Sequence, residues 1–194
     1  MHFKINNEDE FNSMTIENIT IEEVNSTYVV FRDCIIKNVN FFDVTLDRVQ
    51  FSHVEFIGCD LSNINLEEAS IHYCSFKNCR LMGTHLLAAS IREVKFENCQ
   101  CDYIVLGTSQ LKDVLFKESS LRQAGLDDCK FNRVIFQNCD MKEIELIGTN
   151  LRGVDLSTCE IEGLKVKLEQ IRGAKISLMQ SVEFSKMLGL QIKE

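Results

Sequence analysis

Histidine and cysteine side chains are the groups in this sequence best suited to catalysis or metal binding, and their spacing argues against both. The four histidines do not lie at a metal-ligand spacing from one another, from cysteines or from a carboxylate cluster; they are His2, His53, His72 and His85. Cys74 and Cys79 are five residues apart, which is not a zinc-site spacing. The sequence also has no glycine-rich phosphate loop and no nucleophile–base pair. We therefore expect no enzymatic activity, no cofactor and no metal.

The nine cysteines are predicted to be reduced thiols. Their number is odd, and the first residues lack the apolar core of an export signal. Cys59, Cys79 and Cys99 are 20 residues apart and are predicted to stack. Their backbones would then lie within reach of a disulfide, but side chains stacked in this way point in one direction. We interpret these cysteines as small buried packing residues.

Carboxylates outnumber basic side chains, with 29 Asp and Glu against 21 Lys and Arg and a formal net charge of −8. This excess disfavours direct binding to nucleic acid or to an anionic membrane, which needs an excess of Lys and Arg. No apolar stretch approaches the about 18 residues of a membrane-spanning helix. The predicted location is the cytoplasm.

The cysteine, histidine and charged side chains are positioned by a five-residue repeat that runs from Phe11 to Ile176. Every fifth residue, called the centre of its unit, is apolar at all of the 34 positions except Ser26, and ten of the thirteen phenylalanines are centres. The residue two before each centre is mostly small or β-branched, and eight of the nine cysteines are found there. A period of five excludes both a continuous amphipathic helix and an alternating strand.

A chain that points two residues of every five inward must turn a corner after each unit. Four corners close a square, so one coil takes 20 residues, and like residues then stack, as in the column Phe56, Phe76, Phe96. Glycines such as Gly58 and Gly83 follow the centre by two residues, where a turn favours them. We predict an all-β, four-sided parallel β-helix of about eight coils over residues 11–176, with backbones spaced by about 4.8 Å.

The two ends depart from the repeat. Residues 1–10 are interpreted as an N-terminal cap, and residues 177–194 as a short α-helix and tail. Ser177 to Gln180 reads as a capping box, with the helix running to about Leu188 and Gly189 as its left-handed stop. One side of the helix is predicted to cover the open coil and the rest to form a homodimer; a simple end cap is the alternative. The candidate dimerisation residues are Leu178, Met179, Val182, Phe184, Met187, Leu188, Leu190 and Ile192.

The repeat also assigns the outward residues to four faces. The face with centres Leu61, Leu81 and Leu121, named the Leu61 face, has nine acids against three bases. The adjoining Leu66 face, which includes Leu46 and Leu126, has six acids against three bases. The Ile91 face has a net charge of +3, and the remaining face, the Phe56 face, balances. Rows of carboxylates can imitate a phosphate backbone; an acidic surface that serves only solubility is the alternative.

The candidate partner-binding residues lie on the two acidic faces. They are Asp43, Asp60, Asp102, Asp140 and Glu143 on the Leu61 face, and Glu67, Glu68, Asp127 and Asp128 on the Leu66 face. Phe42 and Met82 are outward apolar residues of the Leu61 face, two coils apart. They are candidate contact anchors within a polar surface.

The unit resembles that of pentapeptide-repeat proteins, which is a small residue, Asp or Asn, Leu or Phe, and two variable residues. Matching units are Cys59-Asp60-Leu61-Ser62-Asn63, Cys139-Asp140-Met141-Lys142-Glu143, Thr149-Asn150-Leu151-Arg152-Gly153 and Val154-Asp155-Leu156-Ser157-Thr158. The resemblance covers residues 11 to about 176 and implies a right-handed β-helix.

In its overall plan the chain is similar to the quinolone-resistance proteins of the Qnr and MfpA type. Those are rod-shaped dimers that resemble duplex DNA and bind DNA gyrase and topoisomerase IV. The resemblance implies a topoisomerase partner, a homodimer through the tail and lowered fluoroquinolone sensitivity. The register has no insertion, so the loops of many Qnr proteins are missing, as they are in MfpA-type members. An interaction scaffold for another protein is the alternative.

Overall fold

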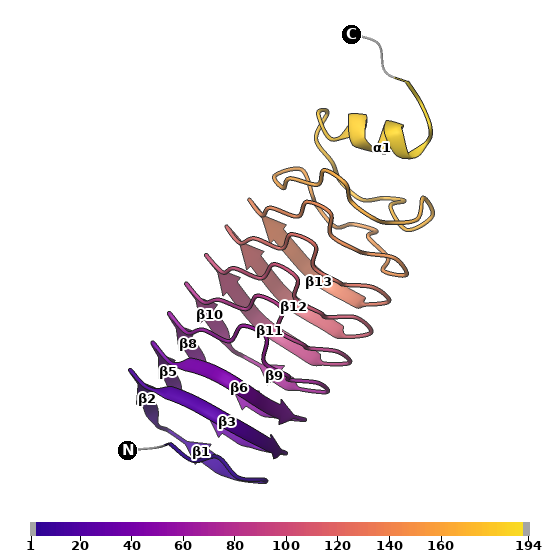
Figure 1. Cartoon of the computed structure of the whole chain (residues 1–194). Coiled ribbons are helices and arrows are strands. Elements are labelled where there is room, and N and C mark those ends of the chain that lie inside the picture. Colours follow the sequence, from indigo (N-terminus) through magenta and orange to yellow (C-terminus); the bar gives the residue numbers. More distant parts are fainter. Residues whose placement is uncertain (1–2, 192–194) are drawn as a thin grey trace.

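The computed structural model describes residues 3–191 and shows a rod of stacked coils with a helix at its C-terminal end (Figure 1). Residues 20 apart pair in parallel register, as in Phe56↔Phe76 and Phe76↔Phe96. The elements are β1 (Glu10–Asn12), β2 (Thr15–Glu17), β3 (Thr20–Thr27), β4 (Val30–Arg32), β5 (Ile35–Lys37), β6 (Asn40–Asp47), β7 (Gln50–Ser52), β8 (Glu55–Ile57), β9 (Ser70–His72), β10 (Ser75–Lys77), β11 (Ser90–Glu97), β12 (Gln110–Lys117), β13 (Lys130–Gln137) and α1 (Ser181–Met187). The predicted all-β parallel solenoid with one short helix is confirmed.

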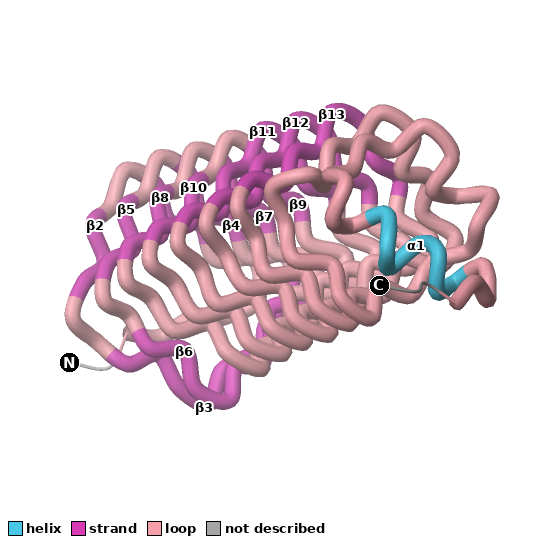
Figure 2. Tube along the Cα trace, turned by 90° about the horizontal axis from the view of Figure 1, so that it is seen from above, coloured by secondary structure: helices cyan, strands magenta, loops and turns pink. Residues whose placement is uncertain are grey.

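Strands cover two adjoining sides of the rod. The row β1–β4–β7–β9 forms the Ile91 face, and the row β2–β5–β8–β10 forms the Phe56 face. The longer strands β11, β12 and β13 turn the corner between these faces and join both rows into one 11-stranded sheet. On the two acidic faces most coils pair through single bridges, such as Asp60↔Arg80 and Asn65↔His85. The separate pair β3–β6 forms the corner of these two faces near the N-terminus (Figure 2).

The corners explain the glycines of the repeat. The residue two after each centre has a positive φ at corner after corner, for example 51° at Asn38, 62° at Gly58 and 54° at Asn78. Asn, Asp and Gly adopt this left-handed conformation more readily than other residues. At Gly58 an added Cβ would also lie 2.7 Å from Oδ1 of Asn38. The predicted turn position of the glycines is therefore confirmed.

The core is a set of ladders along the rod axis. The rings of Phe56 and Phe76 stack with centroids 4.4 Å apart and planes 4° apart, and Phe76–Phe96 and Phe96–Phe116 follow at 4.8 and 4.7 Å. Offset stacking of this kind adds to the free energy gained by burying the rings. The predicted phenylalanine column is present, and each of these rings is buried.

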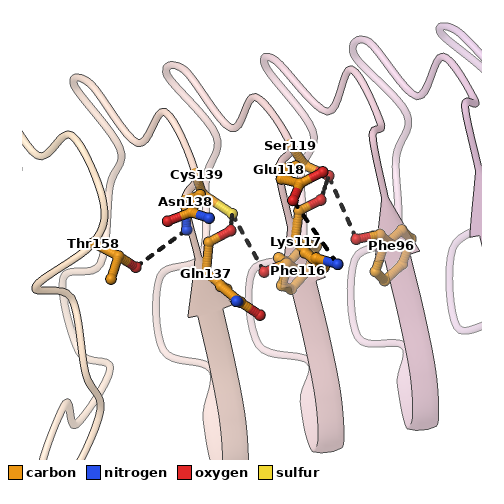
Figure 3. A network of polar contacts seen from close by, with 9 residues as sticks. All are labelled: Phe96, Phe116, Lys117, Glu118, Ser119, Gln137, Asn138, Cys139 and Thr158. Carbon is orange, nitrogen blue, oxygen red and sulfur yellow. Dashed lines mark hydrogen bonds and ion pairs between the residues drawn. The ribbon is translucent and has the colours of Figure 1, made fainter.

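The small inward residues serve as hydrogen-bond donors as well as packing groups. The Ser119 hydroxyl donates to the carbonyl of Lys117 at 2.8 Å and to that of Phe96 at 3.4 Å (Figure 3). The Cys139 thiol donates to the carbonyl of Phe116 at 3.3 Å, one coil away. The same contact recurs from Thr84 to the Leu61 carbonyl at 2.7 Å. Each donor thus caps the carbonyl of the centre 23 residues earlier, a role that the spacing alone did not predict.

Ser26, the polar centre, ties the N-terminal segment to the first coil. Its hydroxyl is buried and donates to the carbonyl of Ile5 at 3.1 Å. The Glu8 amide also donates to the Thr27 carbonyl at 3.0 Å, which continues the spacing of the coil ladder. The polar residue is therefore explained by a backbone partner that only the first coil has.

Two predictions of extent need correction. The strand-paired part makes about six turns from β2 to β13, rather than eight coils, because beyond Gln137 the pairing continues through single bridges such as Asp140↔Glu160. The helix begins at Ser181 rather than Ser177. The capping-box bonds do form, with Ser177 N–H to Gln180 Oε1 at 2.8 Å and Gln180 N–H to Ser177 Oγ at 3.3 Å. They close a tight turn that precedes the helix instead of opening it.

Gln180 closes the end of the rod. Its side-chain amide donates to the carbonyls of Leu156 and Cys159 at 2.7 and 2.6 Å. In earlier coils the equivalent carbonyl accepts a hydrogen bond from the backbone amide of the residue 21 positions further along the chain. The Cys139 carbonyl, for example, accepts one from the Glu160 amide at 2.9 Å. A side chain therefore takes the place of the missing next coil. Gly189 has a φ of 74° and ends the helix as predicted.

Candidate interaction faces

The Leu61 face holds its three bases in ion pairs with acids of neighbouring coils. Arg80 lies 3.6 Å from Asp60 (Nη1 to Oδ2), Arg122 lies 2.6 Å from Asp140 (Nε to Oδ2), and Lys142 lies 2.5 Å from Glu160 (Nζ to Oε2). The Asp140 carboxylate raises the pKa of Arg122, so this guanidinium stays charged. Two of the predicted binding residues, Asp60 and Asp140, are therefore already paired along the rod axis.

The remaining acids of this face carry its net charge. Glu22, Glu23, Asp43, Asp102, Glu143 and Glu162 form no ion pair within residues 3–191. Asp102 accepts hydrogen bonds from the Ser120 hydroxyl and, at 3.0 Å, from the Arg122 amide. Glu143 accepts one from the Gln123 side chain at 2.9 Å. Asp102 and Glu143 are thus held in place by neutral donors and not by a base.

The Leu66 face places its predicted acids in two different environments. Arg48 contacts Glu68 through two nitrogens at 2.9 and 3.0 Å and holds the pKa of that carboxyl below its usual value. Asp127 is half-buried, which raises its pKa, and it accepts the Ile147 amide at 2.8 Å. Glu67 and Asp128 are exposed. The structure therefore places all four on one side, next to the Leu61 face, with Glu68 partly neutralised.

The ion-pair partners are the residues that the sequence analysis did not single out. Arg48–Glu68 and Arg80–Asp60 are separated by 20 residues, the length of one coil, and Arg122–Asp140 by 18. Pairs of opposite charge at these separations were visible in the sequence once the coil length was known. They show that the acidic faces are ordered arrays in which most bases already have partners.

The thiols of Cys74 and Cys129 are packing groups, and the rings of His53 and His72 contact neighbouring side chains. Burial raises the pKa of the thiols of Cys74 and Cys129 to about 12, which keeps them protonated and poorly nucleophilic. His53 stacks on Tyr73 with centroids 4.8 Å apart, and burial, with a smaller contribution from Arg92, lowers the pKa of His72. In the part of the chain that the structure describes, no three His, Cys, Asp or Glu side chains are arranged to hold a metal ion. His2 lies outside that part.

A groove of about 690 Å³ runs along the edge between the Ile91 and Phe56 faces, opposite the edge that the two acidic faces share. The His53–Tyr73 stack lines it at one end and Leu115 and Ile135 at the other. Asp113 and Arg133 form an ion pair in its wall. The groove has apolar walls and charged groups of both signs, so it lacks the large excess of acids of the two acidic faces.

The C-terminal helix divides the predicted dimerisation residues between the core and the surface. Phe184 is buried against the last coil and Val182 is half-buried. Leu178 and Met179 are 87% and 80% exposed, and Leu188 and Leu190 are each 58% exposed. Ile192 and the side chain of Met187 lie outside the described structure. The helix therefore covers the last coil with Phe184, and the exposed apolar residues lie in the turns that precede and follow it. None of the described helices is long and apolar enough to cross a membrane.

Comparison with protein families identifies the repeat. The chain matches the pentapeptide repeat region over residues 49–126 and pentapeptide repeats over residues 27–63, 109–146 and 126–163. Together these matches cover residues 27–163 without a gap, which is more than two thirds of the chain. No curated protein matches the sequence.

Comparison with solved structures agrees with this assignment. HetL, a pentapeptide repeat protein involved in heterocyst differentiation regulation from the cyanobacterium Nostoc sp. strain PCC 7120, is 18% identical, with a TM-score of 0.55 over 89% of each chain. Full-length QnrB1, a plasmid-mediated fluoroquinolone resistance protein, is 16% identical, with a TM-score of 0.38 over 93% of this chain and 100% of its own. At these identities the likeness to HetL shows the fold alone, and the QnrB1 score supports no further argument. From its matched repeats and its 20-residue coils, the chain belongs to the pentapeptide-repeat family.

Proposed function

We propose that this protein binds a type II topoisomerase, DNA gyrase or topoisomerase IV, through its Leu61 and Leu66 faces and thereby lowers fluoroquinolone sensitivity. It acts by binding, as an acidic rod in the place of duplex DNA, and not by catalysis. The observation that carries the proposal is the segregation of acid onto two adjoining faces whose bases are largely paired already. The resemblance to the Qnr and MfpA type supports the choice of partner.

The charge density of the two faces supports a DNA-like surface of reduced strength. Together they carry nine net negative charges over residues 20–168, which is about one per 4 Å at 20 residues per coil and a coil spacing of about 4.8 Å. Duplex DNA carries one per about 1.7 Å. The rod would therefore present somewhat under half the linear charge of DNA, enough to attract a basic DNA-binding surface but easily screened by salt.

The experiment is a gyrase supercoiling assay at rising protein concentration, with and without a fluoroquinolone. Restored supercoiling in the presence of the drug supports binding with protection. Inhibition without restoration keeps the binding and removes the protection. No effect on gyrase or on topoisomerase IV at micromolar protein refutes the proposal.

Charge-reversal variants locate the contact. Reversing Asp60, Asp102, Asp140 and Glu143 to lysine should abolish the effect on the topoisomerase. A matched control reverses Glu17, Glu55, Glu93 and Glu97, which lie on the Phe56 and Ile91 faces, and should leave the effect in place. Equal behaviour of the two variants would mean that the acidic faces do not direct binding.

The second candidate function is an interaction scaffold for another protein. The observation that favours it is the unbroken register of the coils, which leaves no room for projecting loops. Under either function, the exposed residues Leu178, Met179, Leu188 and Leu190 are proposed to bury against a second copy and to form a homodimer through the tail. Removal of apolar surface from water would drive that association.

A further inference from the structure

Phe42 is the one phenylalanine of the thirteen that is exposed, and all thirteen lie within the described residues. Its side chain is 63% exposed on β6, in the Leu61 face, whereas the other twelve are buried or half-buried. A lone exposed apolar residue is common on protein surfaces. Phe42 differs because it lies among carboxylates near the N-terminal end of an acidic face, where a side chain that only maintains solubility would be polar.

The coil register fixes Phe42 on the surface. Phe41 pairs with Ile21 and points into the core, so its neighbour Phe42 must pair with Glu22 and point outward. Paired β3 and β6 hold this position directly before the corner at Asp43, whose φ is 52°, and Phe41 also donates its amide to the Asp60 carbonyl at 2.9 Å. The ring is therefore presented on a rigid element, which lowers the entropy lost when it is buried by a partner.

Charged and apolar residues occupy neighbouring positions of the same face as Phe42. Glu22, Glu23 and Asp43, which we name the acidic collar, form no ion pair among residues 3–191. Lys4 lines a hollow of about 340 Å³ together with Glu22 and Glu23. The Asp60–Arg80 pair follows in the next coils, and Met82, 38% exposed, lies two coils away in the same column as Phe42. The patch therefore combines a net negative charge with an apolar centre.

We propose that Phe42 is an apolar anchor that enters a small apolar pocket on the partner, with the acidic collar meeting Lys and Arg side chains around that pocket. This rests on the proposed function, so the partner is the topoisomerase. Duplex DNA has no apolar side chain that could enter such a pocket. The anchor would let the protein hold the enzyme by a contact that salt does not screen, while the carboxylates direct the approach. Aromatic side chains in desolvated pockets commonly dominate binding energy.

The test measures association and dissociation rates of the full chain with gyrase and with topoisomerase IV across a range of salt concentrations. Phe42→Ala should raise the dissociation rate by about tenfold, with an unchanged salt dependence. Phe42→Leu should recover part of the loss. The collar variant Glu22→Gln/Glu23→Gln/Asp43→Asn should instead slow association and flatten the salt dependence. The matched control is Ile135→Ala, since Ile135 is 55% exposed but lies on the Phe56 face.

Three results would overturn the anchor. If the unmodified protein binds the enzyme and Phe42→Ala binds it with the same affinity, the anchor is refuted and the proposed function stands. A change in the oligomeric state of the free protein on Phe42→Ala would assign the ring to a second copy of the chain. Failure of the unmodified protein to bind either enzyme would refute both proposals before any substitution is made. Thermal unfolding checks that the variants are folded. Phe42→Ala should leave the melting temperature unchanged, and Phe41→Ala should lower the melting temperature.

Discussion

Replacing Gln180 with leucine tests how the C-terminal end of the rod is closed. Gln180 is buried, and its side-chain amide donates to the carbonyls of Leu156 and Cys159. Leucine has a similar volume but cannot donate a hydrogen bond. The substitution therefore removes the group that stands in for the next coil and leaves the packing largely in place.

The two carbonyls differ in what they lose. The Leu156 carbonyl keeps the Cys159 amide at 2.9 Å, so its loss is that of one ordinary hydrogen bond, about 0.5–1.5 kcal/mol. The Cys159 carbonyl accepts no other hydrogen bond within the described residues, and a buried acceptor without a partner costs about 1–3 kcal/mol. Leucine also removes the acceptor of the part-buried Ser177 amide, which can bond to water instead and so adds little. The helix should therefore detach more easily by about 2–4 kcal/mol. The rod itself should keep its stability, because each coil contacts only its neighbours.

Hydrogen exchange followed by mass spectrometry measures this directly. Protection of the segment 177–188 should fall by about 30-fold to 1000-fold, since each 1.4 kcal/mol is about a factor of ten. Protection of β11 to β13 should not change. The matched control is Gln100→Leu, because Gln100 occupies the equivalent position in an inner coil, where its backbone amide caps the Cys79 carbonyl at 3.0 Å. Undiminished protection of 177–188 in Gln180→Leu, or an equal loss along the whole rod, would refute the reasoning.

Other substitutions test the core, the ion pairs and the tail. Phe96→Ala should lower the free energy of unfolding in urea by about 3–5 kcal/mol, because the buried ring stacks on both Phe76 and Phe116; a loss below about 1 kcal/mol would count against the ladder as a major source of stability. Arg48 lowers the pKa of Glu68, and Arg133 lowers the pKa of Asp113. Each pair therefore stabilises the fold fully above the carboxyl pKa of the unfolded chain, and this stabilisation is lost as the pH falls through the carboxyl pKa of the folded protein. Arg48→Gln/Arg133→Gln should therefore flatten the fall in melting temperature below about pH 4; a fall as steep as in the wild type would contradict this. Leu178→Glu/Met179→Glu should shift a homodimer to a monomer in sedimentation without altering strand protection, and an unchanged mass would place the contact elsewhere.

The sequence determined most of the architecture because a strict period leaves few alternatives. Five residues per unit, two of them inward, set the coil length, and the coil length set which residues stack, as Phe56 does on Phe76. The same register assigns each acid to a face. It also fixed Phe41 as a core residue and Phe42 as a surface residue, although the two are chemically identical.

Tertiary structure decided the features that depend on orientation between coils. The pairing of Arg122 with Asp140, and not with an acid exactly one coil away, follows from side-chain reach across the surface. The donation from Cys139 to the Phe116 carbonyl depends on how closely one coil lies on the next. At the C-terminal end, the contacts of Ser177 and Gln180 read as a helix start in the sequence, but the buried carbonyl of Cys159 draws the Gln180 side chain inward and delays the helix to Ser181. A repeat specifies its own interior, whereas its ends are shaped by whichever groups satisfy the unpaired backbone.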